Sequence, residues 1–223
     1  MQFAKSIAAR LPESWQFELK RRHFARQIAR GSFVTDEPEY VLLPTLLRPG
    51  DWALDIGANI GHYTQRLSDL VGPGGRVLAF EPVPQTFALL TANVRQFATA
   101  NTTLINAAVS DRLEVLGMEM PSFASGLSNY YRAHLVQGSQ GLQVLTVPVD
   151  ALGLDGRVKL IKIDAEGHEA TVLAGMRQLL QSHRPTLILE TGSDELVASL
   201  VAVGYRAERL PGSPNVLLRA LSV

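Results

Sequence analysis

A glycine-bearing loop at residues 55–61 (DIGANIG) has the residue types of a ligand-binding turn. It follows a short apolar run and precedes an amphipathic one, so it should join a strand to a helix. Gly57 allows a sharp turn and close approach of a ligand, and the N–H groups at the helix start favour an anion. The dinucleotide fingerprint G-x-G-x-x-G has a glycine where this loop has Asn59, which favours a small anion such as a carboxylate over the pyrophosphate of NAD. An ordinary turn that binds nothing is the alternative.

A single acid, Glu81, ends the next apolar run. In a doubly wound sheet an acid at this position binds the two ribose hydroxyls of an adenosine, in an NAD enzyme or in an S-adenosylmethionine enzyme. Pro82 and Pro84 make the following chain stiff and extended, which suits the wall of a pocket. A solvated glutamate at a strand end is the alternative.

A third group of polar residues lies at 162–169 (KIDAEGHE). It follows a strand that should lie beside the first one across the switch point of the sheet, where ligands of open α/β sheets bind. Its acids and its histidine exceed what helix capping requires, so Asp164, Glu166 and His168 are candidate functional residues. Capping of the following helix is the alternative role for Glu166.

The elements that must position these residues alternate between short apolar runs and longer amphipathic ones, which is typical of βα units around a parallel sheet. The expected strands are 52–56, 76–81, 102–108, 158–164 and 186–190, and the expected helices are 62–71, 84–98, 169–180 and 194–202. Residues 112–149 carry β-formers and no strong helix, which predicts a β-rich antiparallel insertion. The tail at 205–210 and 216–219 predicts a hairpin.

The N-terminal segment, residues 1–36, is basic. An amphipathic helix is expected at 12–30, with apolar residues at helical spacing that include Trp15, Leu19 and Phe24. Its apolar stripe should pack on the main domain, residues 37–223. Contact with an anionic membrane surface, an acidic partner or a second copy of the chain is the alternative.

The composition predicts one globular domain: 46% of the residues are hydrophobic, 19% are charged and the net charge is zero. A chain without net charge is not expected to bind nucleic acid. No cysteine is present, which excludes disulfides, thiolate metal sites and thiol nucleophiles and is compatible with the cytoplasm. No apolar run is long enough for a signal peptide or a membrane span, so a cytoplasmic protein is expected.

Five segments together resemble the FkbM family of S-adenosylmethionine-dependent methyltransferases. They are DIGANIG (55–61), FEP (80–82), NAAVSD (106–111), KIDAEGHEATVLAG (162–175) and PTLILE (185–190). The resemblance implies an α/β fold: the class I, Rossmann-like methyltransferase sheet of seven strands with the last one antiparallel. It also implies methylation of a hydroxyl on a sugar, glycolipid or polyketide-type metabolite. The cofactor residues that it implies are Asp55, Gly57, Ala58, Asn59 and Gly61 at the methionine end, Glu81 at the ribose, the loop from Asn106 to Asp111 at the adenine, and Asp164.

Methyl transfer to a hydroxyl needs a group that takes the proton of the acceptor. Asp164 is the first candidate, followed by Glu166 and His168. A divalent metal held by Asp164 and Glu190 could do the same, but no third ligand is evident, so no metal site is predicted. Two other functions stay open: an NAD-linked oxidoreductase, which the missing middle glycine disfavours, and a non-catalytic module that binds a partner through the basic helix.

Overall fold

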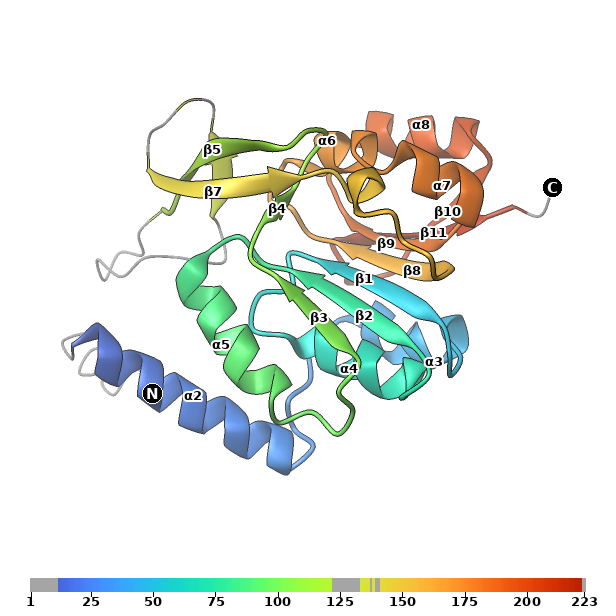
Figure 1. Cartoon of the computed structure of the whole chain (residues 1–223). Helices are drawn as coiled ribbons and strands as arrows, with labels where there is room; N and C mark the ends of the chain where they lie inside the picture. Colours follow the sequence, from blue (N-terminus) through green and yellow to red (C-terminus); the bar gives the residue numbers. More distant parts are fainter. Residues whose placement is uncertain (1–11, 122–132, 137, 139–140, 222–223) are drawn as a thin grey trace.

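The structure, a computed structural model, describes residues 12–121, 133–136, 138 and 141–221. Its centre is a seven-stranded sheet (Figure 1). The strands are, in order across the sheet, β10 (Tyr205–Arg209), β11 (Asn215–Ala220), β9 (Thr186–Glu190), β8 (Val158–Ile163), β1 (Trp52–Ile56), β2 (Arg76–Phe80) and β3 (Thr102–Ile105). The last strand, β11, is antiparallel to β9 and β10, whereas β9, β8, β1, β2 and β3 pair in parallel. The predicted sheet is confirmed, with β8 beside β1.

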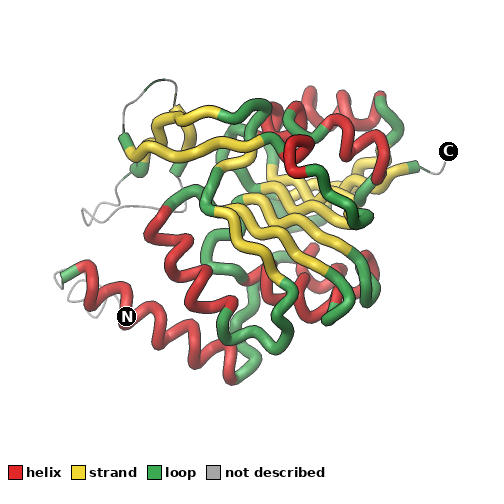
Figure 2. Tube along the Cα trace, viewed as in Figure 1, coloured by secondary structure: helices red, strands yellow, loops and turns green. Residues whose placement is uncertain are grey.

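Helices cover both faces of this sheet (Figure 2). One face packs on η1 (Pro38–Leu42), α3 (Leu43–Leu46), α4 (His62–Val71) and α5 (Pro84–Val94), and the other on α6 (Glu169–Ala174), α7 (Arg177–His183) and α8 (Asp194–Ala202). Because successive side chains of a strand point to opposite faces, Ile163 packs on the second helix layer and Leu160 on the first. The central strands are therefore apolar on both sides, as expected for a parallel sheet.

The expected strand 102–108 is wrong in its second half. β3 ends at Ile105, and residues Ala108–Val109 form a separate strand, β4, in another sheet. The side-chain amide of Asn106 donates to the backbone oxygens of Glu81 (2.8 Å) and Pro82 (3.1 Å). These bonds tie the chain to the end of β2 at the point where it leaves the main sheet.

Two expected helices also differ from the prediction, one because it is divided and one because it is shorter. The helix at 169–180 is broken into α6 and α7 at Gly175, where a Cβ atom would lie 1.9 Å from the backbone oxygen of Ser110. Such close packing against another segment requires a glycine and interrupts the helix there. The helix at 84–98 ends at Val94, and hydrogen-bonded turns follow it.

A second, four-stranded sheet occupies the connection between β3 and β8. Its strand order is β4, β7 (Leu142–Val147), β5 (Glu114–Glu119) and β6 (His134–Val136). β5 pairs antiparallel with β6 and β7, as the sequence predicts, but β4 pairs in parallel with β7. In the described part of this connection, the helical structure is the short turn η3 (Val149–Leu152).

The N-terminal helix, α2 (Glu13–Ala29), lies along α5 (Figure 1). Its residues Phe17, Phe24 and Ile28 pack against a buried cluster of the domain, whereas Trp15 and Leu19 are 65% and 51% exposed. Of the helices in the described ranges, none is both long and apolar enough to cross a membrane. Membrane-surface or homo-oligomer contact through α2, and the domain boundary at residue 36, stay predictions.

Candidate active site

A cavity open to solvent lies at the carboxyl ends of β1, β2 and β8. This is the edge at which open α/β sheets bind ligands. Residues from all three predicted segments line it: Gly57 and Asn59, Glu81, and Asp164, Glu166 and His168. The structure therefore brings together the three sequence segments that carry the candidate chemistry.

Gly57 brings the first loop into direct contact with the end of β8. The amides of Gly57 and Ala58 donate to the backbone oxygen of Phe80 (3.0 and 2.9 Å), and the amide of Asp164 donates to that of Ile56 (3.0 Å). Gly57 has a φ of 78°, and a Cβ atom on it would lie 1.9 Å from the backbone oxygen of Asp164. A glycine is therefore required both by the backbone conformation and by the space.

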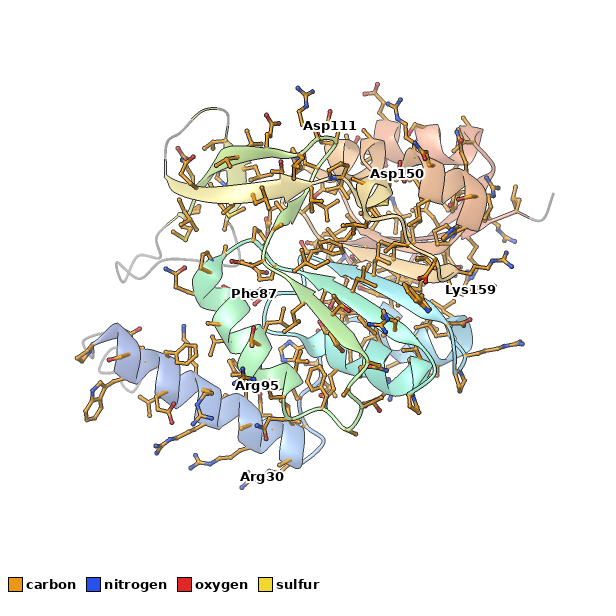
Figure 3. The ribbon with its side chains drawn as sticks, viewed as in Figure 1. Arg30, Phe87, Arg95, Asp111, Asp150 and Lys159 are labelled. Carbon is orange, nitrogen blue, oxygen red and sulfur yellow. The ribbon has the colours of Figure 1, made fainter. Side chains whose placement is uncertain are left out.

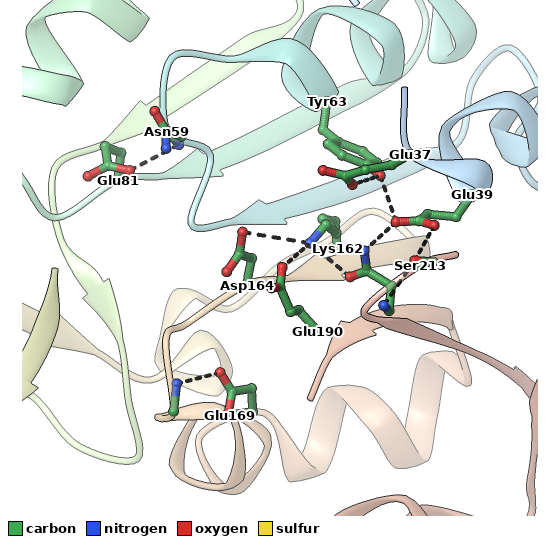
Figure 4. Close-up of polar contacts among 12 residues, drawn as sticks. Glu37, Glu39, Asn59, Tyr63, Glu81, Lys162, Asp164, Glu169, Glu190 and Ser213 are labelled. Carbon is green, nitrogen blue, oxygen red and sulfur yellow. Dashed lines mark hydrogen bonds and ion pairs between the residues drawn. The ribbon is translucent and has the colours of Figure 1, made fainter. Parts of the chain in front are cut away.

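Glu81 is held in the cavity wall by two backbone N–H groups. One carboxylate oxygen accepts from the amide of Asn59 (3.0 Å; Figure 4) and the other from that of Val83 (2.9 Å). The residue is only 6% exposed, and its burial raises the pKa of the carboxyl to about 7. Since a carboxylate oxygen can accept more than one hydrogen bond, both oxygens keep the capacity to bind hydroxyl groups of a ligand.

Asp164 follows β8 directly, and its backbone amide continues the pairing with β1. The turn after it contains two residues with positive φ, Glu166 (48°) and Gly167 (93°). His168 lies 3.0 Å from the hydroxyl of Ser110 through Nε2, and burial lowers the pKa of its imidazole. Glu169 accepts from the amide of Gly167 (2.8 Å), so its carboxylate serves the start of α6.

Five other residues of the predicted cofactor site do not line the cavity. Asp55 is buried towards α4, where Thr64 donates to its carboxylate (2.6 Å). Ala58 packs in an apolar cluster, Gly61 begins α4 with a φ of 99°, Asn106 holds the chain after β2, and Asp111 pairs with an arginine at the edge of the molecule (Figure 3). These residues contact other parts of the protein and do not face the cavity.

Sequence reasoning missed the apolar part of the wall. Met118 of β5 and Leu135 of β6 line the same cavity, together with Val109 and Phe80 of the strands beside it. Met118 also packs against Val83, so the second sheet is docked on the loop after β2. The β-formers of residues 112–149 predicted strands, but nothing in their spacing indicated where those strands would lie.

The described residues contain no group of three or more histidine, aspartate or glutamate side chains that could hold a metal ion. Asp164 and Glu190, the pair considered as metal ligands, both lie near the ammonium group of Lys162, which is 3.9 Å from each carboxylate. These two acids therefore already share a cationic side chain.

The raised pKa values of the buried acids predict how stability changes with pH. Burial raises the pKa of Glu81 from 4.5 to about 7 and that of Asp55 from 3.8 to about 6. Each folded acid binds its proton more tightly than the unfolded chain does, so the stability it contributes at low pH is lost as the pH rises through its folded pKa.

We therefore expect the contribution of these two acids to the free energy of unfolding to fall between about pH 4 and pH 7, by about 1 kcal/mol per group and pH unit. Urea denaturation across this range, for the wild type and for Glu81→Gln, measures the effect. The glutamine variant should lose the Glu81 part of the slope and become the more stable protein relative to wild type as the pH rises. Identical slopes for the two proteins would contradict the assignment.

The seven-stranded sheet and the cavity at its carboxyl edge define the class I S-adenosylmethionine methyltransferase fold. Two solved structures share this fold. A methyltransferase FkbM from Methylobacillus flagellatus KT aligns with a TM-score of 0.55 at 17% identity over 92% of this chain and 59% of that chain. Aeropyrum pernix fibrillarin in complex with S-adenosyl-L-methionine aligns with a TM-score of 0.51 at 18% identity over 82% of this chain and 73% of that chain.

Residues 55–206 match the family described as the methyltransferase FkbM domain, and the chain belongs to this family. The family membership that the motifs predict is confirmed. The match begins at Asp55 and includes all five segments on which the resemblance rests.

Two curated relatives are also methyltransferases. Hexuronic acid methyltransferase AglP from Haloferax volcanii is 31% identical over 131 residues, which cover 57% of this chain and 51% of the relative. 31-O-demethyl-FK506 methyltransferase FkbM from Streptomyces tacrolimicus is 40% identical over 85 residues, which cover 38% and 32%. The matches span about half of the first relative and a third of the second. They support methyltransferase function over the NAD-linked and non-catalytic alternatives.

Proposed function

We propose that the domain binds S-adenosyl-L-methionine in this cavity and transfers its methyl group to a hydroxyl oxygen of a small-molecule, glycan or lipid acceptor. The observation that carries the proposal is the placement of Glu81. Its carboxylate is buried in the cavity wall, fixed by two backbone amides, and still able to accept bonds from two hydroxyl groups. A ribose presents such a pair of hydroxyls.

The remaining walls of the cavity fit the other parts of this cofactor. Val109, Met118 and Leu135 provide an apolar surface suited to an adenine ring. Gly57 and Asn59 line the cavity on the first loop, and Asp164, whose backbone packs against Gly57, lines it with a carboxylate that could pair with a cationic group. Glu81, these apolar residues and the segment from Gly57 to Asn59 are therefore the residues that would hold the cofactor.

The bound cofactor supplies a methyl group that is already activated on a sulfonium. The protein has to place the acceptor hydroxyl in line with that group, exclude water and accept a proton. Asp164 suits the last task because its side chain is 36% exposed at the cavity. Glu166 and His168 line the same cavity and are the other candidates.

Two facts about the chain and its relatives support a proposal for the class of acceptor. By their names, the curated relatives methylate a hexuronic acid and 31-O-demethyl-FK506. The chain has no net positive charge with which to hold a nucleic-acid backbone. We therefore propose a hydroxylated metabolite, sugar or lipid headgroup as the acceptor, in the cytoplasm.

Calorimetric titration tests the cofactor assignment without knowledge of the acceptor. We expect S-adenosylhomocysteine to bind and NAD to bind at least about a hundredfold more weakly, because the loop lacks the middle glycine of the dinucleotide fingerprint. Glu81→Gln should weaken S-adenosylhomocysteine binding about 10- to 150-fold, since hydrogen bonds to a charged group contribute about 1.5–3 kcal/mol. Preferential binding of NAD, or equal affinity of the two proteins, would refute the proposal.

A further inference from the structure

A layer of polar side chains lies beside the cavity, on the face of the sheet that packs on α4. Four strands of this face carry a buried apolar residue and, two positions nearer the carboxyl edge, a polar one. The apolar residues are Ala53, Leu160, Ile188 and Leu217, and the polar ones are Asp55, Lys162, Glu190 and Asn215. Because side chains two apart share a face, this polar layer lies directly above the apolar core.

Lys162 is the centre of this layer and is 3% exposed. Its Nζ donates to Oδ1 of Asn215 (3.2 Å) and lies 3.9 Å from the carboxylates of Asp164 and Glu190 (Figure 4). The ring of Tyr63 covers it, with 5.4 Å between Nζ and the ring centroid. A buried ammonium group is stable only when it is paired, so these contacts fix it beside the two acids.

Residues outside the matched family segment hold Lys162 in place. Asn215 donates to Glu39, and Glu39 also accepts from Ser213 (2.7 Å) and from Tyr63 (3.1 Å). Glu39 precedes the matched range 55–206, and Ser213 and Asn215 follow it. Segments on both sides of the matched range thus meet at one side chain of β8.

We propose that Lys162 is a positioning residue for methyl transfer, which holds the carboxylates of Asp164 and Glu190 at fixed places around one ammonium group. The inference rests on the proposed function, because Asp164 is there the group that meets the acceptor hydroxyl. Asp164 has a partly exposed side chain just after β8, and the buried ammonium group of Lys162 gives it a fixed partner. Glu39 and Asn215 supply the rigid support behind that partner.

The pKa of Glu190 reports this arrangement. It is raised to about 7 by burial and by Asp164, and Lys162 acts against this rise. The other titratable groups that face Lys162 or Glu190 are Glu166 after β8, Glu37 and Glu39 before and within η1, Tyr63 on α4 and Asp55 on β1. Removal of the ammonium group should therefore raise the pKa of Glu190 further.

The test is a pH titration of side-chain carboxyl ¹³C shifts in the full chain without cofactor, with Glu190 assigned from the spectrum of Glu190→Gln. In Lys162→Met we expect the pKa of Glu190 to rise by at least about one pH unit. Lys159→Met is the matched control, because Lys159 lies near the other end of the same strand (Figure 3). It should leave Glu190 unchanged. A folded Lys162→Met protein in which Glu190 still titrates near 7 would overturn the proposal.

A second variant keeps the proposal falsifiable if Lys162→Met does not fold. Asp164→Asn removes a neighbouring negative charge and should lower the pKa of Glu190, because the two acids face the same ammonium group. An unchanged Glu190 in this variant would show that the three side chains are not one unit. Neither titration needs cofactor or acceptor, so this result is independent of the S-adenosylhomocysteine titration that tests the proposed function.

Once an acceptor is identified, Lys162→Met should lower kcat and shift the pH profile of kcat while the KM for the cofactor stays nearly constant.

Discussion

Replacement of Asp164 with asparagine should lower the rate of methyl transfer by about 10² to 10⁴, the usual loss when a positioned proton acceptor is removed. The substitution keeps the size of the side chain and removes its ability to take a proton. Asp164 lies at the cavity after β8, but it is also one of the two carboxylates paired with the buried ammonium group of Lys162, so its replacement should cost about 1–3 kcal/mol of stability. Turnover with labelled cofactor, measured on an acceptor found by screening hydroxylated sugars and lipids, gives the rate.

Three comparisons make this result specific. Glu166 and His168 line the same cavity. The variants Glu166→Gln and His168→Gln should each lose less turnover than Asp164→Asn. Urea denaturation shows whether the variant is folded. An asparagine variant with near wild-type turnover would remove Asp164 from the mechanism and make Glu166 or His168 the candidate. A loss that added magnesium reverses would instead support a metal bound by Asp164 and Glu190.

The strands and the sheet could be predicted because short stretches of sequence indicate them. Alternating apolar runs and glycine-bearing turns define the strands, and the position of the 162–169 segment after a strand places it beside the first loop. The structure has β8 next to β1 with Asp55 opposite Lys162 in the register. The faces of the strands also follow from alternation, which is why Ile163 and Asp164 point to opposite sides.

The parts that failed depend on contacts between distant segments. The helix breaks at Gly175, which packs against the backbone of Ser110: a Cβ atom built on this glycine would lie 1.9 Å from the Ser110 oxygen. Ser110 is 65 residues away in the sequence, so no local pattern indicates this contact. Asp55 and Lys162 lie on the same face of the sheet. The side chain of Asp55 does not reach the cavity, however, because Thr64 of α4 covers it and donates to its carboxylate. Spacing along the chain contains neither fact.

The acids Glu37 and Glu39 were missed for the same reason. They lie just before and within the short helical turn η1 and share a hydrogen bond donor, the hydroxyl of Tyr63, at 2.5 and 3.1 Å. Burial raises the pKa of Glu37, whereas the hydroxyl of Ser213 and other donors lower that of Glu39. Only the folded chain shows that this segment meets β8 and β11 behind the cavity.

Replacement of Gly57 with alanine is the stability change that we expect to be largest. The new Cβ atom would lie 1.9 Å from the backbone oxygen of Asp164, and neither of the two backbones is a flexible end that can move aside. The alanine would also have to adopt a φ of 78°, which costs about 1–2 kcal/mol for a residue with a side chain. With overpacking of about 1–3 kcal/mol added, the free energy of unfolding should fall by about 2–5 kcal/mol.

Gly212→Ala separates the two causes. Gly212 has nearly the same φ, 79°, but nothing lies within 4 Å of a Cβ atom built on it. Its alanine variant should lose only the conformational part, about 1–2 kcal/mol, and bind S-adenosylhomocysteine as the wild type does. Gly57→Ala should be less stable than Gly212→Ala in urea and should bind this ligand more weakly, because the contact between the first loop and Asp164 forms one wall of the cavity. Equal stability of the two variants would mean that the ends of β1 and β8 are not held in this close contact.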